Sequence, residues 1–217
     1  MTLTTKQIRI RAVLGAFCIT SALLLVSVSA LAADTVVRNH QIDGSETRRL
    51  TVENAVGTIQ IKAADDDQIR AEVELEGQRH GIFRRKKDVS EVDIEINQRG
   101  DQLTLALHED DVQGNWTLYI PDVEAVSVQL GVGSLEVDQV SAGFSIEVGV
   151  GSVELSMPQQ ALGAFEGNVG VGGISQSGLQ NYSSNRAVVT ESAEGHGLGN
   201  YSVTIEVGVG DITLNAY

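Results

Sequence analysis

The sequence predicts an all-β protein whose C-terminal half is a short parallel β-solenoid, a β-helix-like stack of similar coils. Three observations favour this fold class. A Gly-Val-Gly cassette recurs with its first glycine at positions 131, 149, 170 and 208, at intervals of 18, 21 and 38 residues, and recurrence at a period of this size is typical of stacked repeats. β-Branched residues alternate on both sides of each cassette, as they do in half-buried strands. Two-residue turns such as Asn-Gly, which commonly join antiparallel strands, are absent between the copies.

Each cassette is predicted to form a strand, a tight bend and a second strand. In the first copy Val128, Leu130 and Val132 alternate, the pattern breaks at Gly133-Ser134, and Leu135 starts it again. Because Val132 and Leu135 are three residues apart, the strand must turn a corner for both to face inward. Glycine suits such a corner because it admits positive φ and close backbone approach. The glycines expected to shape the corners are Gly57, Gly131, Gly133, Gly149, Gly151, Gly170, Gly172, Gly208 and Gly210.

Like segments in like register favour parallel stacking, with each copy lying on its predecessor about 4.8 Å away. A β-sandwich or a mixed antiparallel sheet is the alternative. In the third copy Gln176 occupies a position that is apolar in the other copies, so we expect a loosened rung or a bulge there. In a stack, the first glycines would form a bare outward strip that a packed loop, a second protomer or an elongated ligand can approach.

The N-terminal half contains a fifth, degenerate copy at 52–61, with Ala55 and Gly57 in the glycine positions. A lead-in strand is expected within 34–49. Alternating apolar residues predict further strands at 69–75, 92–96, 103–107 and 116–120, joined by hairpin-like turns. This half is therefore expected to contain antiparallel hairpins, within a single domain that covers residues 33–217.

Residues 1–32 have the pattern of a secretory signal peptide. A basic start is followed by an apolar run at 12–28 and by Ala30-Leu31-Ala32, the small-residue pattern read by signal peptidase. We predict cleavage between Ala32 and Ala33 and a location in the periplasm or at the cell surface. An uncleaved membrane anchor is the alternative, since the run approaches spanning length. The one cysteine, Cys18, lies inside this segment, so the exported chain would need no disulfide.

The charge of the chain excludes some classes of partner. Its formal net charge is −14, and removal of the three basic residues of the signal segment makes it −17. A strongly acidic body argues against binding nucleic acid, whose phosphates it would repel, and against flat adsorption on anionic lipid. It is compatible with cationic partners.

One basic cluster interrupts the acidic chain, between two of the expected strands. The simplest interpretation is a solvated hairpin loop. The sharper hypothesis is a docking tip in which the two apolar residues insert into a membrane or a partner while the cations pair with phosphate or acidic groups. Membrane contact is expected only through this tip. Its residues are Ile82, Phe83, Arg84, Arg85, Lys86 and Lys87.

No catalytic, metal or cofactor site is predicted. The four histidines fall in four different segments without the spacing of metal ligands, and a Gly-x-Ser-x-Gly nucleophile motif is absent. Surface turns explain the acidic runs at 65–67 and 109–111. A β-helix enzyme acting on polysaccharide would need three or more charged side chains converging in one cleft. Glu136 and Glu154 are the pair that a parallel stack would bring together.

The repeated Gly-x-Gly-(Ser/Asp)-(Ile/Leu/Val)-x-(Val/Leu) units behind a signal peptide resemble a bacterial exported family of unknown function that is labelled "putative adhesin". The motif matches 52–61 and 128–217, about half of the chain. The resemblance implies an all-β envelope protein with β-helix-like repeats and no established catalytic residues. We therefore expect a non-enzymatic scaffold that binds a protein or a surface polymer of the envelope. The alternatives are a polysaccharide-acting β-helix enzyme and an envelope stress or signalling partner.

Overall fold

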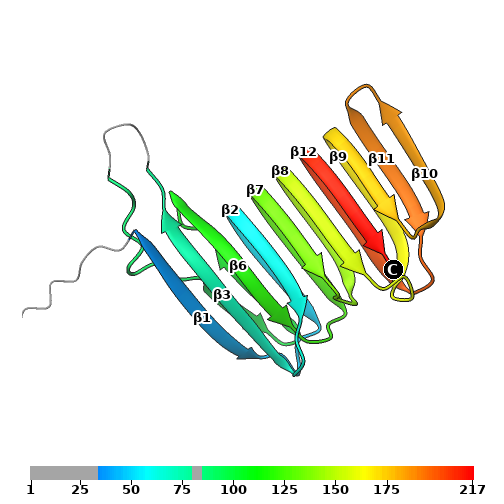
Figure 1. Cartoon of the computed structure of the whole chain (residues 1–217). Coiled ribbons are helices and arrows are strands. Elements are labelled where there is room, and N and C mark those ends of the chain that lie inside the picture. The colour runs from blue at the N-terminus through cyan, green and yellow to red at the C-terminus, as the bar shows by residue number, and fades with distance from the viewer. Residues whose placement is uncertain (1–33, 80–84) are drawn as a thin grey trace, which may run out of the picture. The chain divides into compact units, whose positions relative to one another are not determined.

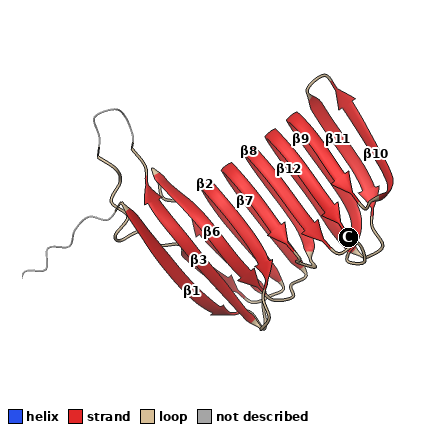
Figure 2. Ribbon diagram, in the orientation of Figure 1, coloured by secondary structure: helices blue, strands red, loops and turns tan. Residues whose placement is uncertain are grey.

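The computed structural model describes residues 34–79 and 85–217 and confirms that the protein is all-β, since the described residues form strands and their connections without a helix (Figures 1 and 2). No helix within these ranges is long and apolar enough to cross a membrane. The predicted signal segment, 1–32, lies outside the described residues. The strands are β1 (Thr35–Asp43), β2 (Arg49–Ala63), β3 (Gln68–Gly77), β4 (Glu95–Arg99), β5 (Gln102–Leu107), β6 (Val112–Ile120), β7 (Ala125–Asp138), β8 (Gly143–Met157), β9 (Leu162–Ser177), β10 (Gln180–Ala187), β11 (Thr190–His196) and β12 (Tyr201–Ala216).

All the strands belong to one mixed sheet, whose main path runs β1-β3-β6-β2-β7-β8-β12-β9-β11-β10 (Figure 1). Its centre consists of the five long strands β2, β7, β8, β12 and β9, which pair in parallel. Their cassettes are in register: Gly133 lies opposite Gly57 on one side and Gly151 on the other. The predicted parallel, in-register pairing of the cassettes is thus confirmed, and so is the fifth copy in β2.

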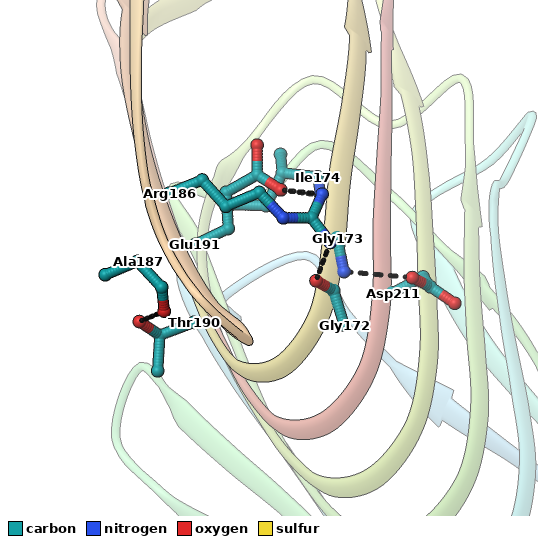
Figure 3. Close-up of polar contacts among 8 residues, drawn as sticks. All are labelled: Gly172, Gly173, Ile174, Arg186, Ala187, Thr190, Glu191 and Asp211. Atoms are coloured by element: carbon teal, nitrogen blue, oxygen red, sulfur yellow. Dashed lines mark hydrogen bonds and ion pairs between the residues drawn. The ribbon is translucent and has the colours of Figure 1, made fainter.

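Each long strand bends at its cassette, so that it has a first arm and a second arm joined by a U-shaped turn (Figure 3). The two arms face one another across the core. In β9, for example, a Cβ built on Gly167 of the first arm would lie 3.3 Å from Cδ1 of Ile174 in the second arm. Inward side chains of both arms belong to one buried cluster, with Ile146 1 % and Leu155 0 % exposed in β8. The hydrophobic core therefore lies between the two arms of the bent sheet and consists of the inward side chains of both arms.

The second glycine of each cassette explains why the bend needs this residue. Its φ lies between 134° and 149° in all five copies, a region that L side chains rarely adopt. A Cβ at Gly151 would lie 1.6 Å from the carbonyl oxygen of Gly133 in the neighbouring strand. The first glycine is restricted by proximity alone, since a Cβ at Gly149 would lie 2.6 Å from the Gly131 oxygen. Close packing of the bends at backbone distance thus excludes side chains at the second position of all five copies and at the first position of β7, β8, β12 and β9, whereas β2 has Ala55 there.

The expectation that each copy lies on its predecessor is wrong for the last two copies. β12, at the C-terminal end, lies between β8 and β9, and β9 pairs on its other side with the antiparallel strand β11. The 38-residue interval before the last cassette contains the β10–β11 hairpin, which extends the sheet beyond β9 (Figure 1). The third copy is therefore the terminal rung of the parallel stack.

This position explains the polar residue in the third copy. Gln176 belongs to the second arm of β9, beyond which no further strand pairs among the described residues, so its slot is only half-buried. Its Oε1 accepts a hydrogen bond from the Leu179 amide at 3.3 Å. Of the two expected alternatives, a loosened rung or a bulge, the bulge is wrong, because the pairing of β9 with β12 continues without a shift from Val171 to Ser177. Terminal repeats tolerate such departures because they have a neighbour on one side only.

The inward orientation predicted for Val132, Val150 and Val209 is also wrong. These side chains are 48 %, 47 % and 47 % exposed. The chain turns over four residues, starting at the first glycine and not at the second, so the valine between the two glycines lies at the apex of the bend. The three-residue step from Val132 to Leu135 does not join two inward side chains.

Two valines of β8 provide a direct test of this orientation. Val148→Ala is expected to lower the free energy of unfolding by about 2 kcal/mol, because Val148 is 3 % exposed and its removal leaves a cavity. Val150→Ala, two residues later in the same strand, is expected to change it by about 0.5 kcal/mol or less. Urea unfolding followed by circular dichroism measures both. Equal losses would contradict the outward position of Val150.

The N-terminal half contains one antiparallel hairpin of the predicted kind, β4–β5. The other antiparallel pairs, β1 with β3 and β3 with β6, join strands that are not consecutive in the chain. In addition, β5 and β6 pair in parallel with the first and second arms of β2. The strand predicted at 92–96 lies three residues later in the chain, since β4 spans Glu95–Arg99. Residues 88–94 instead cover the end of the core at β1, where Arg38 donates hydrogen bonds to the carbonyls of Ser90 and Val92 at 2.5 and 2.8 Å.

Candidate functional site: the glycine trough and the valine ridge

An open trough of about 920 Å³ runs across the parallel strands, on the outer side of the first arms next to the bend. Its floor consists of the residues in the first-glycine position, so the bare strip expected from the sequence is present. Leu107 at the end of β5 and the following His108 lie at one end, and the β10–β11 hairpin lies at the other. The name glycine trough is used below for this groove, whose floor residues are Ala55, Gly131, Gly149, Gly208 and Gly170.

One side of the glycine trough is a row of polar side chains that stand two residues before each floor position. In the order of the strands, this polar ladder is Glu53, Gln129, Glu147, Glu206 and Asn168. Glu147 and Glu206 are directly opposite each other in neighbouring strands, an arrangement in which like charges repel. Neither carboxylate has a hydrogen-bond or ion-pair partner within the described ranges, whereas Glu53 lies 3.3 Å from Nε2 of His108. The ladder therefore presents uncompensated negative charge.

Next to the floor, at the apex of the bends, lies an apolar row whose residues are not among those that line the trough. Each floor residue is followed directly by a valine at the apex of the bend, and pairing places the five valines in one line across the strands. Exposed apolar residues that occur singly need no explanation, but a contiguous row of them indicates a contact surface. This row is called the valine ridge. It consists of Val56 (39 % exposed), Val132 (48 %), Val150 (47 %), Val209 (47 %) and Val171 (46 %).

A polar network holds the end of the trough at β9 and β11 (Figure 3). Glu191, only 9 % exposed, accepts hydrogen bonds through Oε2 from the Ile174 amide at 3.2 Å and from Arg186 at 3.3 Å. Asp211 of β12 accepts one from the Gly173 amide at 3.0 Å. Glu191 thus satisfies a backbone donor on the side of β9 where no further strand among the described residues pairs with its second arm, and Asp211 satisfies one on the side of β12. The end wall of the trough is thereby fixed.

The predicted docking tip is described only in part, because Ile82, Phe83 and Arg84 lie outside the described residues. Arg85 is exposed. Lys86 forms an ion pair with Glu76 at 2.7 Å, and Lys87 pairs with Glu109, whose hydrogen bond raises the pKa of the lysine. Two of the four cations thus contact the acidic body of the chain. The docking tip remains a prediction.

The other groups considered in the sequence lie apart from the trough or are held in local contacts. His40 pairs with Asp93 at 2.8 Å, and a hydrogen bond from Arg70 lowers the pKa of Asp66. Glu136 and Glu154 pair as expected, but on the second arms, outside the trough. Within the described ranges no group of three or more His, Cys, Asp or Glu is placed to hold a metal ion.

Sequence reasoning found the floor of the trough but missed the polar ladder beside it and the valine ridge at the bends. The polar ladder could have been found from the residue two positions before each first glycine, which is Glu, Gln or Asn in every copy. The valine ridge was missed because valine in an alternating segment is usually inward. In the structure the turn begins at the first glycine and covers four residues, so the valine that follows this glycine is exposed.

No family model and no curated protein matches this chain. Among solved structures, it is similar to a "putative cell adhesion protein" from Clostridium sporogenes, with 14 % sequence identity and a TM-score of 0.49 over 84 % of this chain and 100 % of the other. It is also similar to a "putative adhesin" from Bacteroides fragilis (10 %, TM-score 0.37, covering 84 % and 97 %) and to one from Parabacteroides merdae (9 %, 0.35, covering 83 % and 77 %). These names agree with the resemblance indicated by the repeat motif.

Proposed function

We propose that the protein is an adhesin-like, non-enzymatic component of the cell envelope that holds an extended segment of a partner in the glycine trough. The observation that carries this proposal is the alignment of five floor positions, four of them glycine, beneath a row of polar side chains. An elongated ligand lying along the stacking direction can approach the backbone and contact one polar side chain from each strand. The parallel, in-register arms support a β-solenoid-like description of this part of the sheet.

The arrangement of charge supports binding over catalysis. Four glutamates, Glu53, Glu147, Glu206 and Glu191, line the trough, which exceeds the three charged groups that an enzyme cleft was expected to need. However, the three in the polar ladder stand in one row on one side, and Glu191 is held by Arg186. Glycoside hydrolysis requires carboxyl groups on both sides of the bond that breaks. No other carboxylate among the described residues lines the trough.

Export is part of the proposal. The signal-peptide pattern of residues 1–32 supports secretion. The chain that remains after its removal has a net charge of −17, which favours contact with cationic groups. A periplasmic or cell-surface location follows. A role as a signalling or stress partner would use the same trough and would differ from the adhesin-like role only in the identity of the ligand.

Charge reversal in the trough tests this function. The double variant Glu147→Lys, Glu206→Lys is expected to weaken retention of the purified protein on immobilised cell-envelope fraction by about tenfold or more, because two neighbouring contacts become repulsive. The matched control is Glu136→Lys, Glu154→Lys, which makes the same change at another pair of exposed, register-paired glutamates on the opposite arm. Retention of the trough variant at the level of wild type and control would refute the proposal.

The second candidate is a polysaccharide-acting enzyme, and the one observation behind it is the pairing of Glu147 with Glu206, since neighbouring carboxyl groups can act as acid and base. This candidate predicts release of new reducing ends from envelope polysaccharide, abolished by Glu147→Gln. Binding without such release favours the first function.

A further inference from the structure

We infer that the open edge of β10 is an interaction edge at which two copies of this chain pair and form a symmetric dimer with one continuous sheet. The inference goes beyond the proposed function, because it concerns the end of the sheet and does not depend on what the glycine trough holds.

β10 is the least protected edge strand of the sheet. Within the described ranges three strands pair on one side only, namely β1, β4 and β10. Proteins usually protect such edges with charged side chains, with proline or by keeping the strand very short. β4 has only five residues, two of them charged, and β1 contains Arg38 and Asp43. β10 has eight residues, no proline and one charge, Arg186, which is already paired with Glu191 at 3.3 Å.

The hairpin determines which backbone groups of β10 point to the open edge. A two-residue turn joins β10 to β11, and Ala187 pairs with Thr190 next to it. The closing pair of such a hairpin exchanges backbone hydrogen bonds, and pairs with and without these bonds then alternate along the strands. Ser184 and Arg186 therefore have amides and carbonyls that point away from β11. All residues from Ser183 to Ala187 are exposed, so a second strand has access to these groups.

One register of β10 against a second β10 is self-complementary. With a two-fold axis at Ser184, this residue exchanges hydrogen bonds with Ser184 of the partner subunit. Ser183 then lies opposite Asn185 of the partner subunit, and both side chains are polar. At the end of the ladder Tyr182 comes opposite Arg186 of the partner subunit, a favourable combination of an aromatic ring and a cation. An axis at Arg186 would instead place two like charges opposite each other.

The arrangement of the two layers leaves room for this pairing. β11 pairs with the first arm of β9, whereas the second arm of β9 pairs only with β12 among the described residues. The β10–β11 hairpin thus extends the layer of first arms by two strands, which lie at the end of the sheet in Figure 1. A two-fold axis perpendicular to the sheet therefore brings the two β10 strands together while the layers of second arms stay apart.

The same axis fixes how the two copies present their outer surfaces. Because it is perpendicular to the sheet, the outer sides of the first arms face the same way in both copies. The two glycine troughs, which lie on those sides, then open in one direction. A dimer that meets an extended surface engages it at two points, which strengthens attachment without any new contact.

The size and charge of the contact set its expected strength. A single short ladder belongs to the small, transient class of interfaces, so we expect a dissociation constant of roughly 10–100 μM. Each exported copy carries a net charge of −17, which opposes association. β10 itself contains no acidic residue, and at physiological salt charges more than about 8 Å apart are largely screened. The measurement is therefore made at physiological salt.

The test compares proline substitutions at two open edges. Sedimentation velocity of the exported chain, residues 33–217, follows its mass from concentrations below this range to well above it. Ser184→Pro removes an outward amide and is expected to weaken dimerisation by about tenfold or more, while circular dichroism stays native because this amide does not bond to β11. The matched control is Gln98→Pro, one residue before the closing pair Arg99–Gln102 of the β4–β5 hairpin, where the amide also points outward. It is expected to dimerise as wild type does.

Cysteine cross-linking tests the register. The one cysteine of the chain, Cys18, lies in the signal segment, so an introduced cysteine is the only thiol of the exported chain. Ser184→Cys places the two thiols at the axis, with Cα atoms about 5.5 Å apart, and a short bis-maleimide is expected to link them. Gln180→Cys, exposed in the same strand, places the thiols about 25 Å apart and is expected to stay unlinked.

A chain that stays monomeric throughout the concentration series would overturn the inference. So would a dimer that Ser184→Pro leaves intact, since it would use another surface, or a series of larger species, which would indicate pairing of β10 with a different edge. Equal cross-linking of the two cysteine variants would contradict the register. Retention of the charge-reversed trough variant on the envelope fraction tests the proposed function separately, so either idea can fail while the other stands.

Discussion

Replacement of Gly151 by alanine is expected to abolish cooperative folding of this protein. At Gly151 φ is 149°, and a Cβ would lie 1.6 Å from the Gly133 oxygen and 2.7 Å from its carbonyl carbon. Both atoms are backbone of a neighbouring strand that is paired along its whole length, so neither can move without breaking the ladder. The loss should exceed about 4 kcal/mol, a large part of the stability of an ordinary domain. Thermal and urea unfolding followed by circular dichroism measure it.

Gly100→Ala is the matched control for conformational strain. Gly100, between β4 and β5, also has positive φ, 61°, but a Cβ there meets nothing within 4 Å. Its replacement should cost about 1 kcal/mol, the penalty of the left-handed conformation alone. If Gly151→Ala were no more damaging than Gly100→Ala, close packing of the bends could not be the reason for the repeated glycine.

Truncation after Asn200 is expected to have an equally large effect, although it removes only the last strand. β12 pairs with β8 on one side and β9 on the other through both arms. Its fully buried side chains are Val203, Ile205, Val207, Ile212 and Leu214, whose burial contributes about 10 kcal/mol together. The truncated chain should therefore lose ordered structure in β9, β10 and β11, which hydrogen exchange and limited proteolysis can locate.

A synthetic peptide of residues 201–217 provides the control for this truncation. Added in trans, it should occupy the gap between β8 and β9 and restore protection of β9, since the strand has full ladders on both sides. A truncated protein that already shows native protection without the peptide would mean that β12 is not an essential central strand.

Local sequence predicted much of the fold because the cassette codes for its own conformation. The alternation around Leu130 and Leu135, with glycines between, is sufficient to predict two strands and a bend, and the equal cassettes predict in-register pairing. The order of the strands was not predictable in this way. The outer faces and core positions of β8, β9 and β12 are nearly equivalent, so the pattern allows any of them to be neighbours. Gln176 was the one residue that indicated the strand order, because a polar residue in a core position suits the strand at the end of the stack.

The candidate site was only half predictable for a similar reason. The floor follows from Gly131 and its equivalents, whose lack of side chains is visible in the sequence. The sides depend on where the turn begins, and a shift of the turn by two residues decides whether Val132 belongs to the core or to the surface. Side-chain orientation at a bend is set by the packing of neighbouring backbones, which alternation alone does not describe.

The late position of β12 in the chain has a consequence for how the protein matures. During synthesis β8 and β9 are complete before β12 exists, and their matching cassettes can pair directly with each other in register. Such a pairing matches the two cassettes but leaves no place for β12, so it must open before β12 can insert between β8 and β9. A chain in which β8 and β9 pair first would therefore fold only after that pairing opens and β12 takes its place between them.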